Sequence, residues 1–249
     1  MCTRFLLEVP AAETGFKKLG LEALAAAVAK AMSRYNIAPG TDLLALRSGE
    51  KTRTARIFTP RWGFPSPAAF SSADAAPAAS RAPLTNARAE TLTQKPSFRD
   101  AFRHRRCLIP ATGFYEWEKR GRARLPWLFR RAGTAPFAFP GLWEPDADGH
   151  AGVVIVTTTP NELMASLHHR MPAMLASAEA CRTWLDTSAS ETDLLSILTP
   201  ADASQMTATP VSPRMNCSDF DSPECVVPAV HGLAARDETD SDNLALGLG

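Results

Sequence analysis

The sequence is short of cysteine, lysine and long apolar runs, and each shortage narrows what the chain can be. Five cysteines occur in 249 residues, with no Cys-x-x-Cys pair, which argues against a zinc ribbon and against a disulfide framework. No apolar run approaches the ~20 residues of a membrane helix, and the N-terminus lacks the charged start and apolar core of a signal peptide. We therefore expect a reducing, cytoplasmic compartment and no membrane partner.

The bulk composition predicts one globular domain with two sections that resist packing. Hydrophobic residues make up 45% of the chain and charged residues 21%, which is enough for a substantial core. Residues 66–83 are mostly Ala, Ser and Pro, and residues 229–249 are acidic with little to bury. We expect a single domain over residues 1–228 with a flexible loop at 66–83, followed by a disordered acidic tail at 229–249.

Lysine is scarce because arginine takes its place, 21 to 6. Residues 81–131 hold eleven Arg and two Lys against four acidic residues, a net charge of +9. A guanidinium contacts phosphate bidentately, so an arginine-rich block suits a phosphate-rich partner such as nucleic acid. A solvated basic surface is the alternative interpretation.

Short β-like runs dominate the middle of the chain. Gly113–Glu118 alternates aromatic and acidic side chains as a half-buried strand does, and Val153–Thr159 is the most β-like run. Apolar side chains at helical spacing predict one amphipathic helix within Phe16–Met32. Most strands come without crossover helices between them. The pattern predicts an α+β fold, a single domain with a mainly antiparallel sheet or barrel-like core and peripheral helices.

Cys2 directly follows Met1, and a residue this small allows methionine aminopeptidase to remove the methionine. The exposed α-amine and thiol would form a 1,2-aminothiol, which condenses with an aldehyde to a Schiff base and then closes to a thiazolidine. The α-amine can equally serve as a base for a thiol nucleophile. A chance cysteine in a frayed terminus is the other interpretation.

Two stretches offer proton-transfer groups for such a nucleophile. Glu116 stands between Tyr115 and Trp117, and a carboxyl group walled by aromatics would hold its proton and act as a general acid. An outward-facing strand glutamate is the alternative. His168 precedes His169 at a helix-to-strand switch, where adjacent side chains point apart and do not suit a metal ion. One of them could shuttle protons, or both could be surface histidines.

A third stretch pairs an amide with a guanidinium. Asn86 lies two residues before Arg88 in the basic block, so the amide could orient an amine while the arginine holds a phosphate. An asparagine in a loop can equally be a turn former. The chemistry outlined for Cys2 needs no metal and no organic cofactor.

Six motifs occur in an order that resembles a known family. They are Met1-Cys2-x-Arg4-Phe5, Arg34-Tyr35-Asn36-Ile37-Ala38-Pro39-Gly40, Arg61-Trp62-Gly63, Asn86-Ala87-Arg88-Ala89-Glu90-Thr91, Cys107-Leu108-Ile109-Pro110 with Gly113-Phe114-Tyr115-Glu116-Trp117, and His168-His169-Arg170-Met171-Pro172. Together they resemble the SOS response-associated peptidase (SRAP) family of the HMCES/YedK type, and they extend over about residues 1–228.

The resemblance implies a sensor of abasic sites in the DNA damage and SOS response. Such a protein crosslinks covalently to ring-opened abasic sites in single-stranded DNA through a thiazolidine at Cys2, and so shields the lesion. The implied catalytic residues are the nucleophile Cys2, Asn86 to position its amine, Glu116 as acid/base and His168 to assist sugar ring opening. The implied DNA-binding residues are Arg4, Trp62, Arg88, Trp117 and Arg170.

The same resemblance implies lyase-like or peptidase (hydrolase) activity without a cofactor or metal, and we expect a monomer in the cytoplasm, associated with the nucleoid. Two positions depart from the family pattern. Thr3 stands where the family has glycine, which restricts the backbone beside the nucleophile. A tryptophan that commonly follows the Trp-Gly motif is missing, and Phe70 is the candidate to replace it.

Two other functions use the same features. A cysteine peptidase or amidohydrolase, including one that acts only on its own Met1 linkage, would employ Cys2 and His168. A non-covalent single-stranded DNA-binding module would need only the basic block, and would retain DNA equally well after Cys2→Ala.

Overall fold

The computed structural model describes residues 3–48, 55–64, 83–145 and 149–229. Cys2, nearly all of the predicted loop at 66–83 and nearly all of the predicted tail at 229–249 lie outside these ranges. The domain boundaries therefore stay a prediction. Within the described ranges, no helix is long and apolar enough to cross a membrane.

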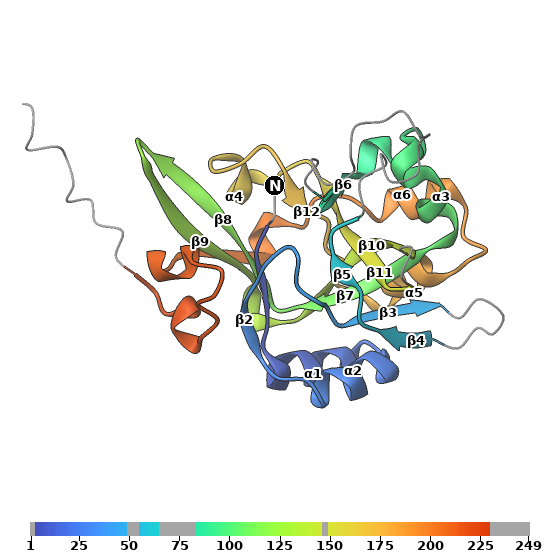
Figure 1. The fold of residues 1–249 in the computed structure, drawn as a ribbon, viewed down its shortest axis with the longest axis horizontal. Helices are drawn as coiled ribbons and strands as arrows, with labels where there is room; N and C mark the ends of the chain where they lie inside the picture. Colours follow the sequence, from blue (N-terminus) through green and yellow to red (C-terminus); the bar gives the residue numbers. More distant parts are fainter. Residues whose placement is uncertain (1–2, 49–54, 65–82, 146–148, 230–249) are drawn as a thin grey trace, which may run out of the picture.

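The fold is α+β, with two mainly antiparallel sheets and helices around them, as the sequence predicts (Figure 1). The first sheet has the strand order β13-β9-β8-β1-β2, and the second follows the path β12-β11-β10-β7-β3-β4 with β5 and β6 added on β11. Among the described strands these are two separate sheets and do not close into one barrel.

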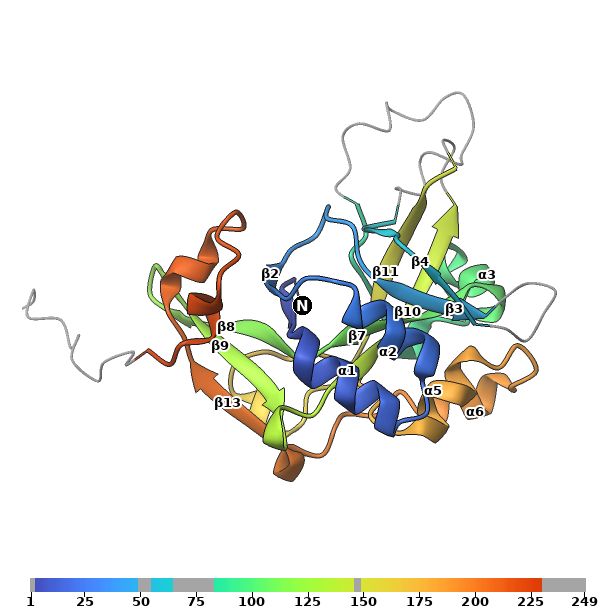
Figure 2. The same cartoon turned by 90° about the horizontal axis from the view of Figure 1, so that it is seen from below.

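The first sheet comprises β1 (Phe5–Leu7), β2 (Arg34–Ile37), β8 (Gly113–Arg120), β9 (Ala123–Arg131) and β13 (Met206–Pro210). Strands β8 and β9 form a long hairpin in which Phe114 pairs with Phe129 near its base and Arg120 with Ala123 at its tip. Figures 1 and 2 both show this hairpin extending away from the body of the molecule. The start of β8 is thus held by β1 on one side, and β9 pairs with β8 from Phe114 to Arg120 on the other.

The second sheet comprises β3 (Ala45–Ser48), β4 (Ala55–Phe58), β5 (Arg61–Trp62), β6 (Asn86–Arg88), β7 (Arg106–Ala111), β10 (Phe137–Pro145), β11 (Ala151–Thr158) and β12 (Met171–Pro172). Its centre is buried on both faces, which is why β7 and β11 are continuous apolar runs instead of alternating ones. Strands β3 and β4 form an antiparallel pair in which Ala45 lies opposite Phe58. Strands β5 and β6 pair with β11 in parallel, an arrangement that the sequence did not indicate.

The predicted helix within Phe16–Met32 is wrong in its bounds. The chain forms two shorter helices, α1 (Val9–Lys18) and α2 (Glu22–Ala29), side by side below the sheets in the view of Figure 1. Gly20 separates them with a φ of +66°, a left-handed conformation that glycine adopts without strain and that a continuous α-helix cannot contain. Because both segments bury the same kind of apolar side chain, their spacing in the sequence resembles one long stripe.

The remaining α-helices are α3 (Pro96–His104), α4 (Glu162–Ala165), α5 (Ala178–Leu185) and α6 (Glu191–Ser196). Local capping explains where two of them begin. The side chain of Asn161 accepts a hydrogen bond from the Met164 backbone, and Ser177 accepts one from Ala180, each at a helix N-terminus. Figure 1 shows α3, α5 and α6 at the end of the molecule opposite the β8–β9 hairpin.

A small second core holds the C-terminal segment, residues 211–228, against the first sheet. Its buried members are Leu6, Tyr115, Leu128, Val211, Met215 and Cys225. Asn36, which is 1% exposed, connects this segment to β2. Its Nδ2 lies 2.9 Å from three carbonyl oxygens, those of Met215, Cys217 and Phe220. Asn36, the asparagine of the Arg34–Gly40 motif, therefore holds the C-terminal segment against β2.

We predict that Asn36→Ala lowers the free energy of unfolding by about 2–3 kcal/mol, because it leaves buried carbonyl groups without their donor. Urea denaturation measures the change. Gln94→Ala, an exposed amide, is the matched control and should change stability by less than about 0.5 kcal/mol. Equal effects of the two variants would contradict this role for Asn36.

Candidate active site

Glu116 occupies the middle of β8, and its residue is 6% exposed. Burial raises the pKa of its carboxyl group above the ordinary value, because the charged form loses water. The sequence left open whether Glu116 is buried or faces solvent, and in the structure it is buried. A carboxyl group in this state can deliver a proton at a pH where an exposed glutamate has already lost it.

The aromatic residue on the same face of the sheet as Glu116 is Trp127, whereas the sequence suggested Tyr115 and Trp117. Successive side chains of a strand point to opposite faces, so Tyr115 and Trp117 turn away from Glu116 toward the C-terminal segment. There the Tyr115 hydroxyl donates to the Tyr35 carbonyl at 2.7 Å. Trp127, directly opposite Glu116 on β9, shares its face.

The start of the described chain lies beside Glu116. Strand β1 runs antiparallel to β8 with Phe5 opposite Phe114, and the Tyr115 backbone N–H donates to the Arg4 carbonyl at 3.0 Å. Because the two strands run in opposite directions, the next residue toward the N-terminus, Thr3, extends along β8 toward Glu116. Backbone pairing thus brings residues that are more than a hundred positions apart to one place.

The Arg4 side chain lies on the face of the first sheet that is opposite to Glu116. Its Nη1 donates to Asn36 Oδ1 and to the Met215 carbonyl, each at 3.2 Å. Burial lowers the pKa of this guanidinium, although an arginine remains charged at neutral pH. Arg4 is therefore a half-buried cation that links β1 to β2 and to the C-terminal segment.

Strand β11 brings two of the motifs together. Ile155 pairs with Asn86 and Thr157 with Arg88 along one edge, while Thr157 pairs with Pro172 along the other. The Asn86 amide is half-buried and donates to Thr85 Oγ1 at 3.1 Å, whereas Arg88 is exposed. The amide and the guanidinium that the sequence singled out therefore stand at one sheet edge, two residues apart along β6.

Arg170 connects these motifs by an ion pair. Its Nη1 and Nη2 donate to the two carboxylate oxygens of Glu90 at 2.8 and 3.0 Å, and Nη2 also donates to the Thr157 carbonyl at 2.6 Å. Burial acts against ionisation of Glu90, but the hydrogen bonds from Arg170 outweigh it and hold the pKa of Glu90 below its usual value. Arg170 is 7% exposed, so its head group here contacts protein, where the sequence suggested a phosphate.

His168 is half-buried and held at Nδ1. The backbone N–H of Arg170 donates to this nitrogen at 3.0 Å, and the Arg170 carbonyl oxygen lies 3.2 Å from it, so the Arg170 backbone orients the ring while the tautomer depends on which of the two contacts is made. Burial lowers the pKa of His168, and the charge of Lys119 on β8 lowers it further. The ring therefore stays neutral under conditions in which an exposed histidine would begin to charge.

Segment 168–170 and strand β8 share one electrostatic environment. The charge of His169 lowers the pKa of Glu116, in opposition to the effect of burial, and Lys119 acts on His168 from the same strand. Figure 1 shows the segment around α4 beside the β8–β9 hairpin. A carboxyl group whose pKa is raised by burial and an imidazole whose pKa is lowered by burial thus share one electrostatic environment.

The two tryptophans expected to contact DNA are engaged within the protein. Trp62 is 1% exposed, its Nε1 donates to the Thr85 carbonyl at 2.9 Å, and its ring packs edge-on against Phe5. A ring buried this deeply supports the core and presents no face for a base to stack on. Trp117 is half-buried and donates to Asn216 Oδ1 at 2.7 Å on the face away from Glu116.

Sequence reasoning missed Glu90, Trp127 and Asn36 as contributors to this region. Glu90 lay inside a quoted motif, and the strand period of two would have excluded Tyr115 and Trp117 as walls of Glu116. Within the described ranges, no cluster of His, Cys, Asp and Glu side chains is arranged to hold a metal ion.

Comparison with known proteins gives consistent similarities. The profile of a family described as "SOS response associated peptidase (SRAP)" matches residues 1–218. Abasic site processing protein YoqW of Bacillus subtilis (strain 168) is 36% identical over 199 residues, which span 77% of this chain and 84% of YoqW. Abasic site processing protein HMCES of Gallus gallus is 28% identical over 211 residues, 75% of this chain and 61% of HMCES.

A crystal structure of a protein from Bacteroides thetaiotaomicron has the same fold. It superposes with a TM-score of 0.71 at 24% identity, over 92% of this chain and 100% of that chain. At this level of identity the similarity concerns the fold alone. The two mainly antiparallel sheets described above are thus an arrangement found in another solved structure.

We predict that Glu90→Gln destabilises the protein by about 1–3 kcal/mol. The change leaves the buried Arg170 guanidinium without its counter-charge, and the partial exposure of Glu90 keeps the cost below that of a fully buried pair. Thermal or urea unfolding measures the loss. Arg88→Gln, which removes an exposed charge in the same motif, should lower the free energy of unfolding by less than about 0.5 kcal/mol. An equal loss of stability in both variants would contradict a stabilising role for the Arg170–Glu90 ion pair.

Proposed function

Because the chain belongs to the SOS response associated peptidase (SRAP) family, we propose that it processes abasic sites in single-stranded DNA by forming a covalent crosslink at Cys2. The observation that carries this proposal is the start of β1 beside the buried Glu116 on β8. Cys2 precedes Thr3, and consecutive Cα atoms lie about 3.8 Å apart. A nucleophile at Cys2 would therefore be within reach of the proton donor.

The proposed reaction joins an aldehyde to an aminothiol with loss of water. The closed sugar of an abasic site first opens, as the anomeric hydroxyl loses a proton and the ring oxygen gains one. The Cys2 amine, exposed after removal of Met1, attacks the C1′ carbonyl carbon, and the carbonyl oxygen leaves as water to give an imine. The thiol sulfur then bonds to the imine carbon while its proton goes to the nitrogen, which closes a thiazolidine. No electrons are transferred to or from the DNA.

Glu116 is suited to the proton transfers at the carbonyl oxygen. Burial raises the pKa of its carboxyl group, so it retains a proton for the departing oxygen at a higher pH than an exposed glutamate would. The protonated group is also neutral, which lowers the cost of keeping it away from water. The same carboxylate can take a proton back when the amine has attacked.

His168 is suited to the opening of the sugar. Its neutral ring presents one protonated and one unprotonated nitrogen, and the Arg170 backbone N–H and carbonyl oxygen, 3.0 and 3.2 Å from Nδ1, hold the ring so that Nε2 points away from them. The lowered pKa favours the neutral form. Nε2 then serves as the proton carrier toward the ring oxygen of the sugar.

DNA binding is assigned to the exposed part of the basic block. Arg88 is exposed two residues after Asn86 and suits a phosphate, while the half-buried Asn86 amide suits the Cys2 amine. Arg170 is assigned to positioning, because its ion pair with Glu90 holds the backbone whose N–H fixes His168. Arg4 acts from the other face of β1 by holding that strand in place.

We predict that the wild-type protein, incubated with a single-stranded oligonucleotide that contains one abasic site, forms an adduct that survives a denaturing gel. The intact mass of the adduct should equal the protein without Met1 plus the oligonucleotide minus one water. Cys2→Ala should abolish the adduct, because neither sulfur attack nor ring closure is then possible.

The control is the same oligonucleotide without the abasic site, which should give no adduct. Absence of the adduct from wild-type protein with a free Cys2 amine would refute the proposal. Retention of DNA only under native, low-salt conditions would then indicate the non-covalent binding module, and release of Met1 or cleavage of an amide would indicate the hydrolase.

We predict that Glu116→Gln slows adduct formation by about 10²–10⁴-fold, because the amide keeps the shape but cannot exchange a proton. In the wild type the rate should fall as pH rises through the raised pKa of Glu116, and this limb should be absent from the variant. Single-turnover gel time courses between about pH 4.5 and 8 measure both effects.

The fold of this variant provides an internal control. Since burial raises the pKa of Glu116, the wild type loses stability as pH rises through that pKa, and Gln does not. Glu116→Gln should therefore be at least as stable as the wild type at about pH 8. A slow variant that is also unfolded would not count as support, whereas a fast, folded variant would exclude Glu116 as the acid/base.

A further inference from the structure

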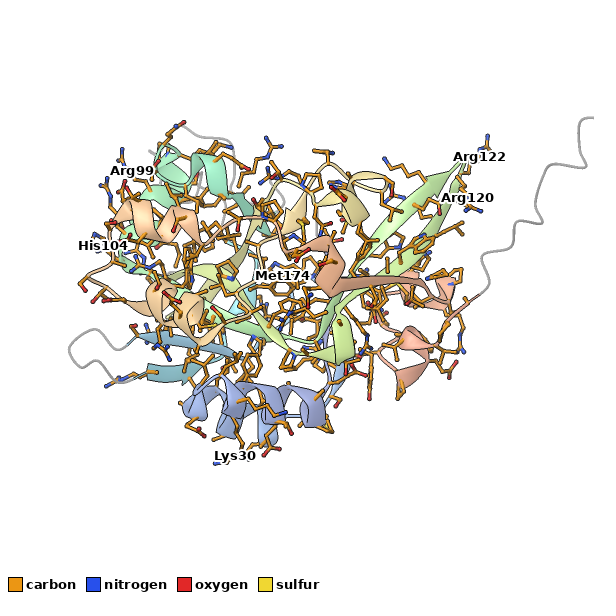
Figure 3. The ribbon with its side chains drawn as sticks, turned by 180° about the vertical axis from the view of Figure 1, so that it is seen from behind. Lys30, Arg99, His104, Arg120, Arg122 and Met174 are labelled. Carbon is orange, nitrogen blue, oxygen red and sulfur yellow. The ribbon has the colours of Figure 1, made fainter. Side chains whose placement is uncertain are left out.

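The basic block of residues 81–131 separates into two regions in space. Figure 3 shows Arg99 and His104 at one end of the molecule and Arg120 and Arg122 at the other. The residues that give this block its net charge of +9 therefore do not form one continuous basic surface. The two ends differ in how far protein groups already balance their cations.

Ion pairs and carbonyl groups engage the cations in the last turn of α3 and directly after it. Arg103 pairs with Glu191 at 2.9 Å, and Arg105 pairs with Asp100 and with Glu144. Arg106 is 6% exposed and donates to the backbone carbonyls of Phe102, Arg103, Trp184 and Asp186. These cations stabilise the junction of α3 and α5 and leave little charge for a partner.

The tip of the β8–β9 hairpin is arranged differently. We define the cationic tip as Lys119, Arg120, Arg122 and Arg124, all of which are exposed. Glu118 is the one acidic residue between 118 and 124, so this stretch has a net charge of +3. Glu118 pairs with Arg120 at 2.7 Å.

The backbone forces two of these like charges together. Lys119 and Arg124 are directly opposite each other in the antiparallel register, which is destabilising for like charges. Gly121, with a φ of +57°, makes the tight turn that places Arg122 at the end of the hairpin. A negatively charged partner between these side chains would relieve the repulsion that the fold maintains.

Acidic groups of the neighbouring C-terminal segment are occupied elsewhere. Glu224 pairs with Arg214, and Asp221 accepts from Arg34 and from the backbone of Tyr35 and Asn36. The contact of this segment with the tip goes through Asn216, whose amide donates to the Arg124 carbonyl at 3.0 Å. That contact fixes the β9 backbone and leaves the charge of Arg124 unchanged.

We propose that the cationic tip binds the phosphate backbone of the DNA strand that flanks the lesion. The tip and Glu116 lie on the same hairpin, three to six residues apart along β8 and its turn, or about 10–20 Å at the rise of a strand. At the ~3.4 Å per phosphate of a strand in duplex DNA that distance spans about three to six phosphates, and an extended single strand would place fewer along it. The proposal rests on the proposed function for its partner, single-stranded DNA, and adds the surface that recruits the strand.

The test is the salt dependence of non-covalent binding, measured by fluorescence anisotropy on the full chain. The probe is an undamaged single strand of about 20 nucleotides, longer than the ~4–16 nucleotides that one small binding fold covers. The tip variant is Lys119→Gln with Arg122→Gln and Arg124→Gln, which keeps the Glu118–Arg120 pair. The control removes three exposed positive charges elsewhere, Lys30→Gln with Lys95→Gln and Arg99→Gln.

We expect the slope of log K against log salt to decrease in magnitude by about 2 in the tip variant, since each lost phosphate contact on a single strand removes about 0.7. The control should keep the wild-type slope. Arg122→Gln alone should remove about 0.7, which keeps the test decisive if the triple variant does not fold. Equal slopes for the tip and control variants would overturn the proposal.

The covalent assay separates this proposal from the one on which it rests. With saturating protein and an abasic oligonucleotide, Arg122→Gln should still form the adduct, because Glu116, His168 and Lys119, whose charge acts on His168, are unchanged. Loss of the adduct from the wild type would refute the crosslinking function whatever the slopes are. A tip variant with the wild-type salt slope and a normal yield of adduct would refute DNA binding by the cationic tip and leave the crosslinking function intact.

Discussion

Antiparallel pairing between β1 and β8 is the constraint on which the candidate site depends. The Tyr115 N–H to Arg4 carbonyl hydrogen bond sets the register, and a slip by one residue would turn Glu116 to the other face. Apolar side chains on both faces resist such a slip, because Phe114 and Phe129 stack on one side while Leu6 and Tyr115 fill the small core on the other. The core thus holds a carboxyl group at a position where burial raises its pKa.

Polar contacts between distant segments complete the arrangement around this pairing. Asn36 holds the C-terminal segment behind β1, and Arg170 joins Glu90 to the strand that follows His168. Asn36 and Arg170 are almost fully buried, so their donors are shielded from water, although the Glu90 carboxylate remains about half exposed. Groups that could move protons therefore rest on a frame of buried hydrogen bonds, whereas the exposed Arg88 and the cationic tip remain available to a large anionic partner.

Much of the local structure could be predicted from the sequence. Strands β8 and β11 were predicted from the runs Gly113–Glu118 and Val153–Thr159, because alternation and a high content of β-forming residues are local properties of the chain. The single helix within Phe16–Met32 was wrong because two short helices around Gly20 leave the same apolar spacing as one long helix. The motifs also identified the family, since their order along the chain is itself a sequence property.

Tertiary structure decided how these residues are used. A strand pattern could not say that Trp127 would stand opposite Glu116, because register is set by packing across strands. Composition could not separate the paired cations near α3 from those of the cationic tip, since their acidic partners come from distant segments, such as Glu191 for Arg103. The sequence by itself determined the chemical groups and the local elements that carry them. Only the folded chain determined which groups are buried, paired or exposed, because those properties depend on contacts between residues far apart in sequence.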